Sequence, residues 1–151
     1  MAIKVGDRLP EATFRVAGPD GLETLTTCSP ANVSCCLPFR ARSPRSFIDS
    51  ADDFKKQGVD RVVCIAVNDP FVLAAWEEKS GGKEKVLFLS DCNAEFTKKI
   101  GMDFDGSGFG LGTRSKRYSA LVEDGVVKIL NVEASPGIAE ASTASKILKS
   151  L

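Results

Sequence analysis

The chain has 151 residues, of which 43% are hydrophobic and 26% charged, a composition typical of a globular domain with one hydrophobic core. Lysine plus arginine and aspartate plus glutamate balance at 20 each, so no overall charge steers the protein toward nucleic acid or an anionic membrane. There is no histidine, which excludes histidine-activated nucleophiles and most zinc sites. We therefore expect a single domain over residues 1–151, with no nucleic-acid or membrane partner, no cofactor and no metal.

The N-terminal sequence predicts the cellular compartment, and the compartment predicts the redox state of the cysteines. The longest apolar run is far shorter than the roughly 18 residues of a membrane helix, and the opening MAIKVGD resembles neither a signal peptide nor a transit peptide. We expect a cytoplasmic protein whose cysteines are mostly free thiols in that reducing compartment. Their number is odd and their spacing is not that of a zinc site; they are Cys28, Cys35, Cys36, Cys64 and Cys92.

The first third of the chain predicts a hairpin, a strand and a helix. ATFRVA (12–17) alternates like a strand, and the turn at 18–21 joins it to LETLTT (22–27). VSCCLPF (33–39) is an apolar extended run. FIDSADDFKKQG (47–58) repeats its apolar residues with a helical period and ends in Lys-Lys and Gly, which predicts an amphipathic helix.

The remainder alternates strands with helices. RVVCIAV (61–67) is typical of a parallel strand covered on both faces. Asn68-Asp69-Pro70 supplies a cap and a first-turn proline for a helix over 71–81. This alternation predicts an α/β fold, a sheet with helices on both faces. The later elements are a strand at 85–91, a helix at 94–101, a glycine-rich loop at 105–112, strands at 118–124 and 126–132, and a helix at 142–151.

Three polar motifs suggest sites. GSGFGLG (106–112) follows a helix and precedes a strand, the reverse of a phosphate loop, and is predicted to be a flexible connection. Asp103-Phe-Asp105-Gly starts like a calcium loop but lacks its final glutamate. Arg114, Lys116 and Arg117 precede a strand; they form either a solvated sheet edge or a place where an arginine binds an anion or lowers a thiol pKa.

The stretch VSCCLPFRARSPRSF (33–47) does not fit this pattern. Adjacent cysteines in a strand point to opposite faces, so Cys35 and Cys36 cannot jointly bind a metal or form an easy disulfide, and we expect them to pack as small apolar residues. RARSPRS (40–46) mixes its basic residues with serine and proline, and we predict no nucleic-acid site there.

Outside residues 28–46 the sequence contains long segments in a familiar order: IKVGDRLPEATF, GVDRVVCIAVNDPFV, LSDCNAEFTKKIGMDFD and GFGLGTRSKRYSALVEDGVVKILNVE. In that order and spacing they closely resemble type II peroxiredoxins, especially the plant cytosolic form. The resemblance implies a thioredoxin-like fold with a central mixed sheet and an N-terminal hairpin. It also implies reduction of hydrogen peroxide and alkyl hydroperoxides, glutaredoxin or thioredoxin as reductant, and a homodimer.

The resemblance assigns two site residues. Arg117 falls on the arginine that stabilises the peroxidatic thiolate, and Cys64 on the resolving cysteine of the plant-like members. A thiol with a pKa near ~8.5 needs such an arginine, or helix N-terminal N–H groups, to ionise at neutral pH. The peroxidatic cysteine itself is not present in its motif, because neither Pro38 nor Pro44 begins a P-x-x-x-T-x-x-C sequence. We therefore expect peroxidase activity to be impaired.

A shifted reading frame explains the missing motif. If each new codon takes the third base of one codon and the first two of the next, residues 33–45 can spell VVLFAVPGAFTP with suitable synonymous codons. That is the family's buried strand and the start of its active-site loop. Our hypothesis is that this segment is a frameshifted translation that returns to frame near Phe47.

Two other functions stay open from the sequence. A catalytically inactive, dimerising or regulatory protein would keep the family's partner surface at Phe71 and around Phe109. An isolated redox-sensing thiol at Cys36 or Cys28 would need a group nearby that stabilises its thiolate.

Overall fold

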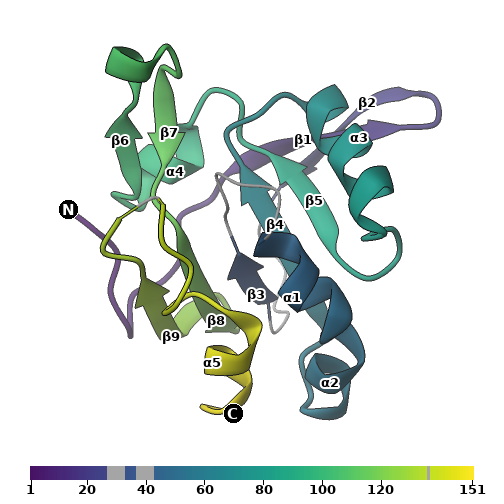
Figure 1. Ribbon diagram of the computed structural model, residues 1–151, viewed down its shortest axis with the longest axis vertical. Helices are drawn as coiled ribbons and strands as arrows, with labels where there is room; N and C mark the ends of the chain where they lie inside the picture. Colours follow the sequence, from purple (N-terminus) through teal and green to yellow (C-terminus); the bar gives the residue numbers. More distant parts are fainter. Residues whose placement is uncertain (27–32, 37–42, 136) are drawn as a thin grey trace.

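A seven-stranded mixed sheet lies at the centre of the protein, in the order β2-β1-β5-β4-β3-β8-β9 (Figure 1). The computed structural model describes residues 1–26, 33–36, 43–135 and 137–151. A second sheet pairs only β6 with β7. The strands are β1 Thr13–Gly18, β2 Gly21–Thr26, β3 Val33–Cys36, β4 Arg61–Ala66, β5 Leu87–Ser90, β6 Asp103–Asp105, β7 Thr113–Ser115, β8 Tyr118–Glu123 and β9 Val126–Val132.

The predicted N-terminal hairpin is present. Strands β1 and β2 pair antiparallel from Thr13↔Thr26 to Gly18↔Gly21. Gly21 has φ +125°, a conformation that residues with a Cβ rarely adopt. Gly21, which marks this turn in the sequence, therefore also makes the turn possible in the backbone.

Strand β3 occupies the centre of the sheet. It pairs parallel with β4 and antiparallel with β8, and Cys36 is in register with both Cys64 and Ser119. The strand expected from VSCCLPF is confirmed for Val33–Cys36. Residues 37–39 of that prediction lie outside the described part of the chain.

The single helix predicted over 47–58 is wrong in its limits, because the structure has two helices there. The first begins earlier and places Pro44 in its first turn, where a missing N–H costs no helical hydrogen bond. Ser50, with ψ 8°, separates the two helices, and the rings of Phe47 and Phe54 stack 5.6 Å apart across the junction. The helices of the protein are α1 Ser43–Asp49, α2 Ala51–Lys56, α3 Pro70–Ser80, α4 Glu95–Lys99 and α5 Ala144–Leu148.

Helix α3 begins and ends where its sequence signals predict. The Asp69 carboxylate accepts hydrogen bonds from the backbone N–H groups of Phe71 and Val72, each at 2.9 Å, and Pro70 is the first helical residue. Gly81 ends the helix in the left-handed conformation. Within the described residues, no helix has the length and apolar character needed to cross a membrane.

Helices cover both faces of the sheet, as predicted, but unequally. On one face Phe88 packs edge-on against Trp76 of α3 at 5.4 Å, and Gly82 lies against both Phe88 and Ile48 of α1. Leu87 and Leu89 alternate with Phe88 and therefore face the other side. That second face is covered by α4 and by the N-terminal segment, which together with the sheet enclose a cavity.

A buried aspartate holds α4 in place. Asp91 is 3% exposed and follows β5. Its carboxylate accepts hydrogen bonds from the Thr97 hydroxyl at 2.6 Å, the Thr97 N–H at 2.8 Å and the Phe96 N–H at 3.2 Å. These contacts fix the short helix, which has too few residues to be stable alone.

The glycine-rich segment, predicted to be a flexible connection, is the loop of a β-hairpin in the structure. Strands β6 and β7 pair across it, and a 3₁₀ turn, η1 Ser107–Phe109, lies between them. The Gly106 N–H donates to the Gly112 carbonyl at 2.7 Å, and Asp105 accepts from the Ser107 N–H. The hydrogen bonds from Ser107 lower the pKa of Asp105. This turn leaves Phe109 86% exposed at its tip.

Candidate functional site

Arg117 is a buried cation immediately before β8. Its side chain is 5% exposed, whereas Lys116 is exposed and Arg114 half-buried. Of the two interpretations of this basic cluster, the solvated edge does not apply to Arg117. An arginine remains charged at any physiological pH, so its burial requires groups that compensate the charge.

The Arg117 guanidinium is only partly satisfied by the described residues. Its Nη1 donates to the Ile138 carbonyl at 3.1 Å. Its Nε and Nη2 are buried and have no hydrogen-bond partner in the part of the chain that the structure describes. Unpaired donors on a buried cation are costly unless an anionic or strongly accepting group occupies the space beside them. Arg117 is therefore poised to bind an anion or to stabilise a thiolate.

Ser119 adds a third orphaned atom close by. Its side chain is fully buried, and among the described residues its Oγ also lacks a partner. Because alternate residues of an extended chain point to the same face, Ser119 and Arg117 lie on one face of the sheet. The sequence reasoning did not single out Ser119, although its spacing of two from Arg117 is the signal that places it there.

Glu133 fixes the segment that covers this corner. Its backbone N–H donates to the Arg117 carbonyl at 2.9 Å. Its Oε1 accepts hydrogen bonds from the Glu140 N–H at 2.8 Å and from the Ser142 N–H and hydroxyl, both at 2.7 Å. The carboxylate thus holds the approach to α5, while Arg117 holds the same segment through Ile138.

The pKa of Glu133 reflects this arrangement. Burial alone would raise the pKa of the carboxyl, but the hydrogen bonds from Ser142, Ala141 and Glu140 together outweigh it and lower the pKa below its usual range. Glu133 is 8% exposed, so the interaction is poorly screened by solvent. The charged form of this side chain therefore stabilises the fold around Arg117.

Cys64 lies on the same face as these groups. It is in β4, is 1% exposed, and pairs in register with Cys36 of β3, which in turn pairs with Ser119 of β8. Residues directly opposite each other in neighbouring strands share a face. The structure thus brings Arg117, Ser119 and Cys64 to one side of the sheet, with strand β3 between Cys64 and Ser119.

Some expectations fall on other parts of the chain. Cys28 and residues 40–42 of the basic stretch lie outside the described residues. Phe71 and Phe109 are 65% and 86% exposed, so both are accessible to a partner. Across the described residues, no cluster of three or more cysteine, aspartate or glutamate side chains is placed to hold a metal ion.

Comparison with known proteins identifies relatives over the whole chain. The Redoxin family model matches residues 36–148. The chain is 42% identical to peroxiredoxin-2E-2, chloroplastic, of Oryza sativa subsp. japonica, over 99% of this chain and 72% of the relative. It is 41% identical to peroxiredoxin-2B of Arabidopsis thaliana, over 99% of this chain and 98% of the relative.

A solved structure agrees in fold. The crystal structure of reduced Prx3 from Vibrio vulnificus in complex with H₂O₂ superposes with a TM-score of 0.90 at 35% identity, over 98% of each chain. The described sheet and helices therefore define the thioredoxin-like fold of the redoxins. The chain belongs to that family and, within it, to the peroxiredoxins, a family of thiol peroxidases.

The relatives also carry residues that this chain lacks. The alignments run over 164 positions with the rice protein and 160 with peroxiredoxin-2B, whereas the chain has 151 residues. Both alignments nevertheless include 99% of the chain. The extra alignment positions are therefore gaps in this chain inside the aligned region, and not an unmatched end.

The lowered pKa of Glu133 predicts a pH-dependent contribution to stability. The folded pKa lies below the unfolded value of about 4.3, so the stabilisation is complete above that pH and is lost as the pH falls through the folded pKa. We expect Glu133→Gln to reduce the free energy of unfolding by about 2 kcal/mol at pH 7 and by much less near pH 3. Urea unfolding followed by Trp76 fluorescence measures both values.

The exposed Glu78→Gln is the matched control and should change stability little at either pH. An equal loss for Glu133→Gln at pH 7 and pH 3 would show that the carboxylate charge does not matter.

Proposed function

We propose that this chain is a type II peroxiredoxin of the plant cytosolic kind, whose chemistry is the reduction of hydrogen peroxide and alkyl hydroperoxides with glutaredoxin or thioredoxin as reductant. The observation that carries the proposal is the buried Arg117, whose Nε and Nη2 lack partners among the described residues. A guanidinium in that state favours a thiolate beside it and the negative charge that develops on a peroxide oxygen. The Vibrio relative crystallised with H₂O₂ supports the substrate class.

The proposed reaction divides between two sulfurs. A peroxidatic thiolate attacks one peroxide oxygen, the O–O bond breaks, and the departing oxygen takes a proton to leave as water or an alcohol. The sulfur is now a sulfenic acid. The Cys64 thiol condenses with it, releasing water and forming a disulfide that the dithiol of the reductant returns to two thiols.

Burial restricts the role of Cys64. It is 1% exposed within a central strand, so its sulfur is shielded from solvent and from the peroxide. Cys64 therefore serves as the resolving cysteine only after local opening of the sheet, and it does not replace the peroxidatic cysteine. In this proposal Arg117 stabilises the thiolate and Cys64 is the resolving cysteine, as the resemblance implies. The sequence has no cysteine at the position of the peroxidatic cysteine in the P-x-x-x-T-x-x-C motif.

The missing motif impairs catalysis in this proposal. The sequence contains no P-x-x-x-T-x-x-C, and a misplacement of about 1 Å can already cost roughly a hundredfold in rate. We expect hydrogen peroxide to oxidise this chain no faster than an ordinary free thiol. Stopped-flow measurement of the second-order rate constant checks this, and Arg117→Ala should leave that rate unchanged.

A restored chain supplies the positive control. Replacing residues 33–45 with VVLFAVPGAFTPTC puts a cysteine directly before Ser46, and we expect at least about a hundredfold gain in rate, lost again when Arg117→Ala is added. The prediction of impaired activity is wrong if hydrogen peroxide oxidises the unmodified protein rapidly and Arg117→Ala abolishes that reaction. Another cysteine would then have taken the peroxidatic role.

The coding DNA tests the origin of residues 33–45. We propose that this segment is the family's active-site strand and loop read in a shifted frame, and the relatives' additional aligned residues support a loss of sequence. The frame that begins at the third base of the Val33 codon should encode PGAFTP ahead of the Phe47 codon. A different peptide in that frame contradicts the frameshift.

A second candidate function rests on exposed aromatic residues. Phe71 at the start of α3 and Phe109 at the tip of the β6–β7 turn are strongly exposed, so both aromatic rings are available to a partner protein. A catalytically inactive peroxiredoxin-like protein that dimerises or regulates through this surface would need no peroxidatic cysteine. Peroxide consumption with a glutaredoxin or thioredoxin recycling system separates the two functions.

Both functions include a homodimer, and its test is direct. We expect the protein to sediment as a dimer, and Phe71→Asp or Phe109→Asp to shift it to monomer, because a buried carboxylate opposes association. Leu22→Asp, at an exposed apolar residue of β2, is the matched control and should leave the dimer intact. A monomeric protein at micromolar concentration would refute this interface.

The cytoplasmic location stays a prediction. Relatives with similar identity include chloroplastic and mitochondrial proteins as well as peroxiredoxin-2B, whose name carries no compartment.

A further inference from the structure

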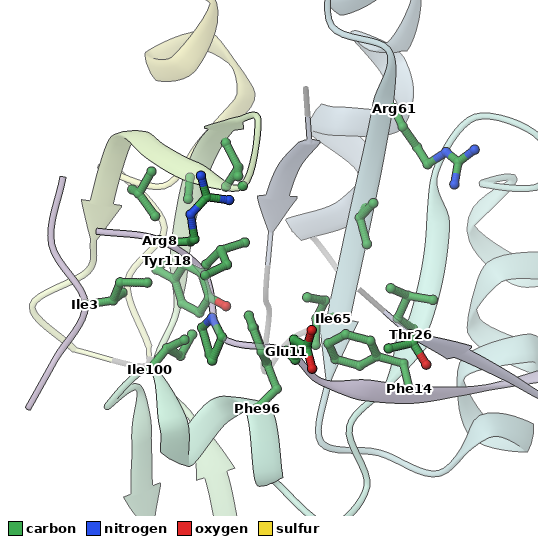
Figure 2. Close-up of a pocket in the computed structure, with 18 of the residues that line it drawn as sticks. Ile3, Arg8, Glu11, Phe14, Thr26, Arg61, Ile65, Phe96, Ile100 and Tyr118 are labelled. Atoms are coloured by element: carbon green, nitrogen blue, oxygen red, sulfur yellow. The ribbon is translucent and has the colours of Figure 1, made fainter. Parts of the chain in front are cut away.

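A cavity of about 430 Å³ lies on the face of the sheet opposite Arg117 (Figure 2). Tyr118 and Ala120 of β8 line it, and these residues alternate with Arg117 and Ser119 along the strand. The cavity is therefore separated from the candidate peroxidase site by the sheet itself. Nothing in the peroxidase proposal uses it.

The floor of the cavity is the apolar face of the central strands. Its described side chains come from β4, β5, β8 and β9, and most of them are branched aliphatic residues. The roof is the N-terminal segment together with α4, as Figure 2 shows for Ile3, Phe96 and Ile100. The floor residues include Val63, Ile65, Leu87, Leu89, Ala120, Val122, Val127 and Leu130.

The roof is fixed by the backbone. The Ile3 N–H donates to the Ile100 carbonyl at 2.9 Å, the Gly6 N–H to the Val127 carbonyl at 2.8 Å and the Leu9 N–H to the Gly125 carbonyl at 2.8 Å. These bonds join the N-terminal segment to α4 at one end and to the β8–β9 hairpin at the other. The space below it is thus part of the fold rather than a gap under a loose chain end.

The linker that follows β2 is poor in apolar side chains. Thr26, the last residue of β2, lines the cavity, and the sequence that leads from it to β3 is Thr-Cys-Ser-Pro-Ala-Asn. That linker contains no Leu, Ile, Val, Met or aromatic side chain. Residues 27–32 therefore offer no large apolar side chain as an occupant of the cavity.

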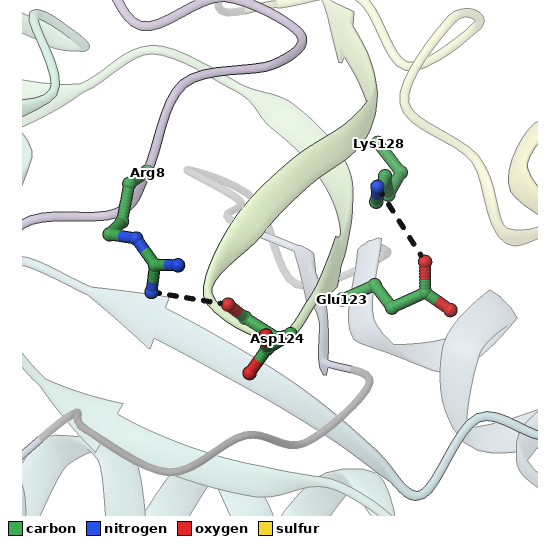
Figure 3. Close-up of polar contacts among 4 residues, drawn as sticks. All are labelled: Arg8, Glu123, Asp124 and Lys128. Atoms are coloured by element: carbon green, nitrogen blue, oxygen red, sulfur yellow. Dashed lines mark hydrogen bonds and ion pairs between the residues drawn. The ribbon is translucent and has the colours of Figure 1, made fainter.

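The charged groups around the cavity cancel. Arg8 and Arg61 are opposed by Glu11 and Asp124, and the Arg8 Nη1 donates to the Asp124 backbone carbonyl at 3.3 Å (Figure 3). The neighbouring Lys128 and Glu123 also pair with each other, at 3.8 Å (Figure 3). The cavity has apolar walls and no net charge. An ion that entered it would lose its hydration without gaining a compensating interaction, so the cavity disfavours charged ligands.

We propose that this cavity is a binding site for an uncharged, apolar small molecule the size of two or three linked aromatic rings. Small-ligand sites typically have volumes of about 300–1,000 Å³, and an apolar cavity of ~150 Å³ already binds benzene while excluding water. The ligand would lie across the sheet face between Phe14 and Tyr118. Its binding is independent of Arg117 and of the thiol chemistry.

The first test uses the neutral fluorophore N-phenyl-1-naphthylamine, whose emission rises in apolar surroundings. We expect saturable binding to the intact protein, and binding at least about tenfold weaker for a naphthalene of similar size that carries a carboxylate. Tyr118 is the chain's single tyrosine, so nuclear Overhauser contacts between the probe and tyrosine-ring protons locate the probe without ambiguity.

Two variants reduce the cavity volume from the neighbouring strands β8 and β9. Ala120 and Leu130 pair in register, so Ala120→Leu and Leu130→Trp add bulk at the same place, and each should weaken probe binding at least about tenfold by filling the site. Leu130 is half-buried on an edge strand and tolerates enlargement better than Ala120. Ala75→Leu adds the same atoms as the first variant at an exposed site of α3 and should leave the affinity unchanged.

Circular dichroism and the thermal midpoint verify that each variant is folded before binding is compared. The proposal is overturned if the probe fails to bind, if folded Leu130→Trp and Ala75→Leu both bind it as the unmodified protein does, or if the probe's contacts are to exposed Phe71 or Phe109 rather than to Tyr118. Equal affinity for the carboxylate probe would overturn the assignment to an uncharged ligand.

Discussion

The insertion of strand β3 between β4 and β8 is the constraint on which the rest of the structure depends. In the order β2-β1-β5-β4-β3-β8-β9, Val33–Cys36 is the only strand of the described residues that joins the two halves of the sheet by hydrogen bonds. The register of Cys36 with Cys64 and Ser119 sets which residues of β4 and β8 share a face. A shift of that register by one residue would turn the strand's side chains to the opposite face.

The corner around Arg117 combines a rigid frame with unsatisfied chemistry. Glu133 holds the segment before α5, and the guanidinium donates one hydrogen bond to that segment at the Ile138 carbonyl. Its Nε and Nη2 nevertheless lack partners in the described residues. The fold thus keeps a preorganised cation on the sheet, although the sequence contains no P-x-x-x-T-x-x-C motif. Preorganisation of this kind, rather than the sulfur alone, is what stabilises charge in a transition state.

The two faces of the sheet are closed in different ways. Helices α1 and α3 bury one face with large side chains such as Trp76 and Phe88. The other face relies on an N-terminal segment pinned by backbone hydrogen bonds and on the five residues of α4. A segment and one short helix fill less volume than paired helices, which is the physical reason why a cavity forms on that face. The same chain therefore has a charged corner on one side and an apolar space on the other.

Local features of the sequence determined the parts of this protein whose signals lie within a few residues of each other. The glycines at 18 and 21 specify the hairpin turn, Asp69 and Pro70 start α3, and the run at 61–67 predicts the buried β4, because caps, turns and apolar runs act through neighbouring backbone groups. The family resemblance pointed to Arg117 and Cys64. The break at Ser50, the β6–β7 hairpin, the orphaned Ser119 and the cavity were decided by tertiary structure. Each of these features depends on which distant segments pack together. Sequence spacing does not tell how much volume such packing leaves empty, or which polar atoms it leaves without a hydrogen-bond partner.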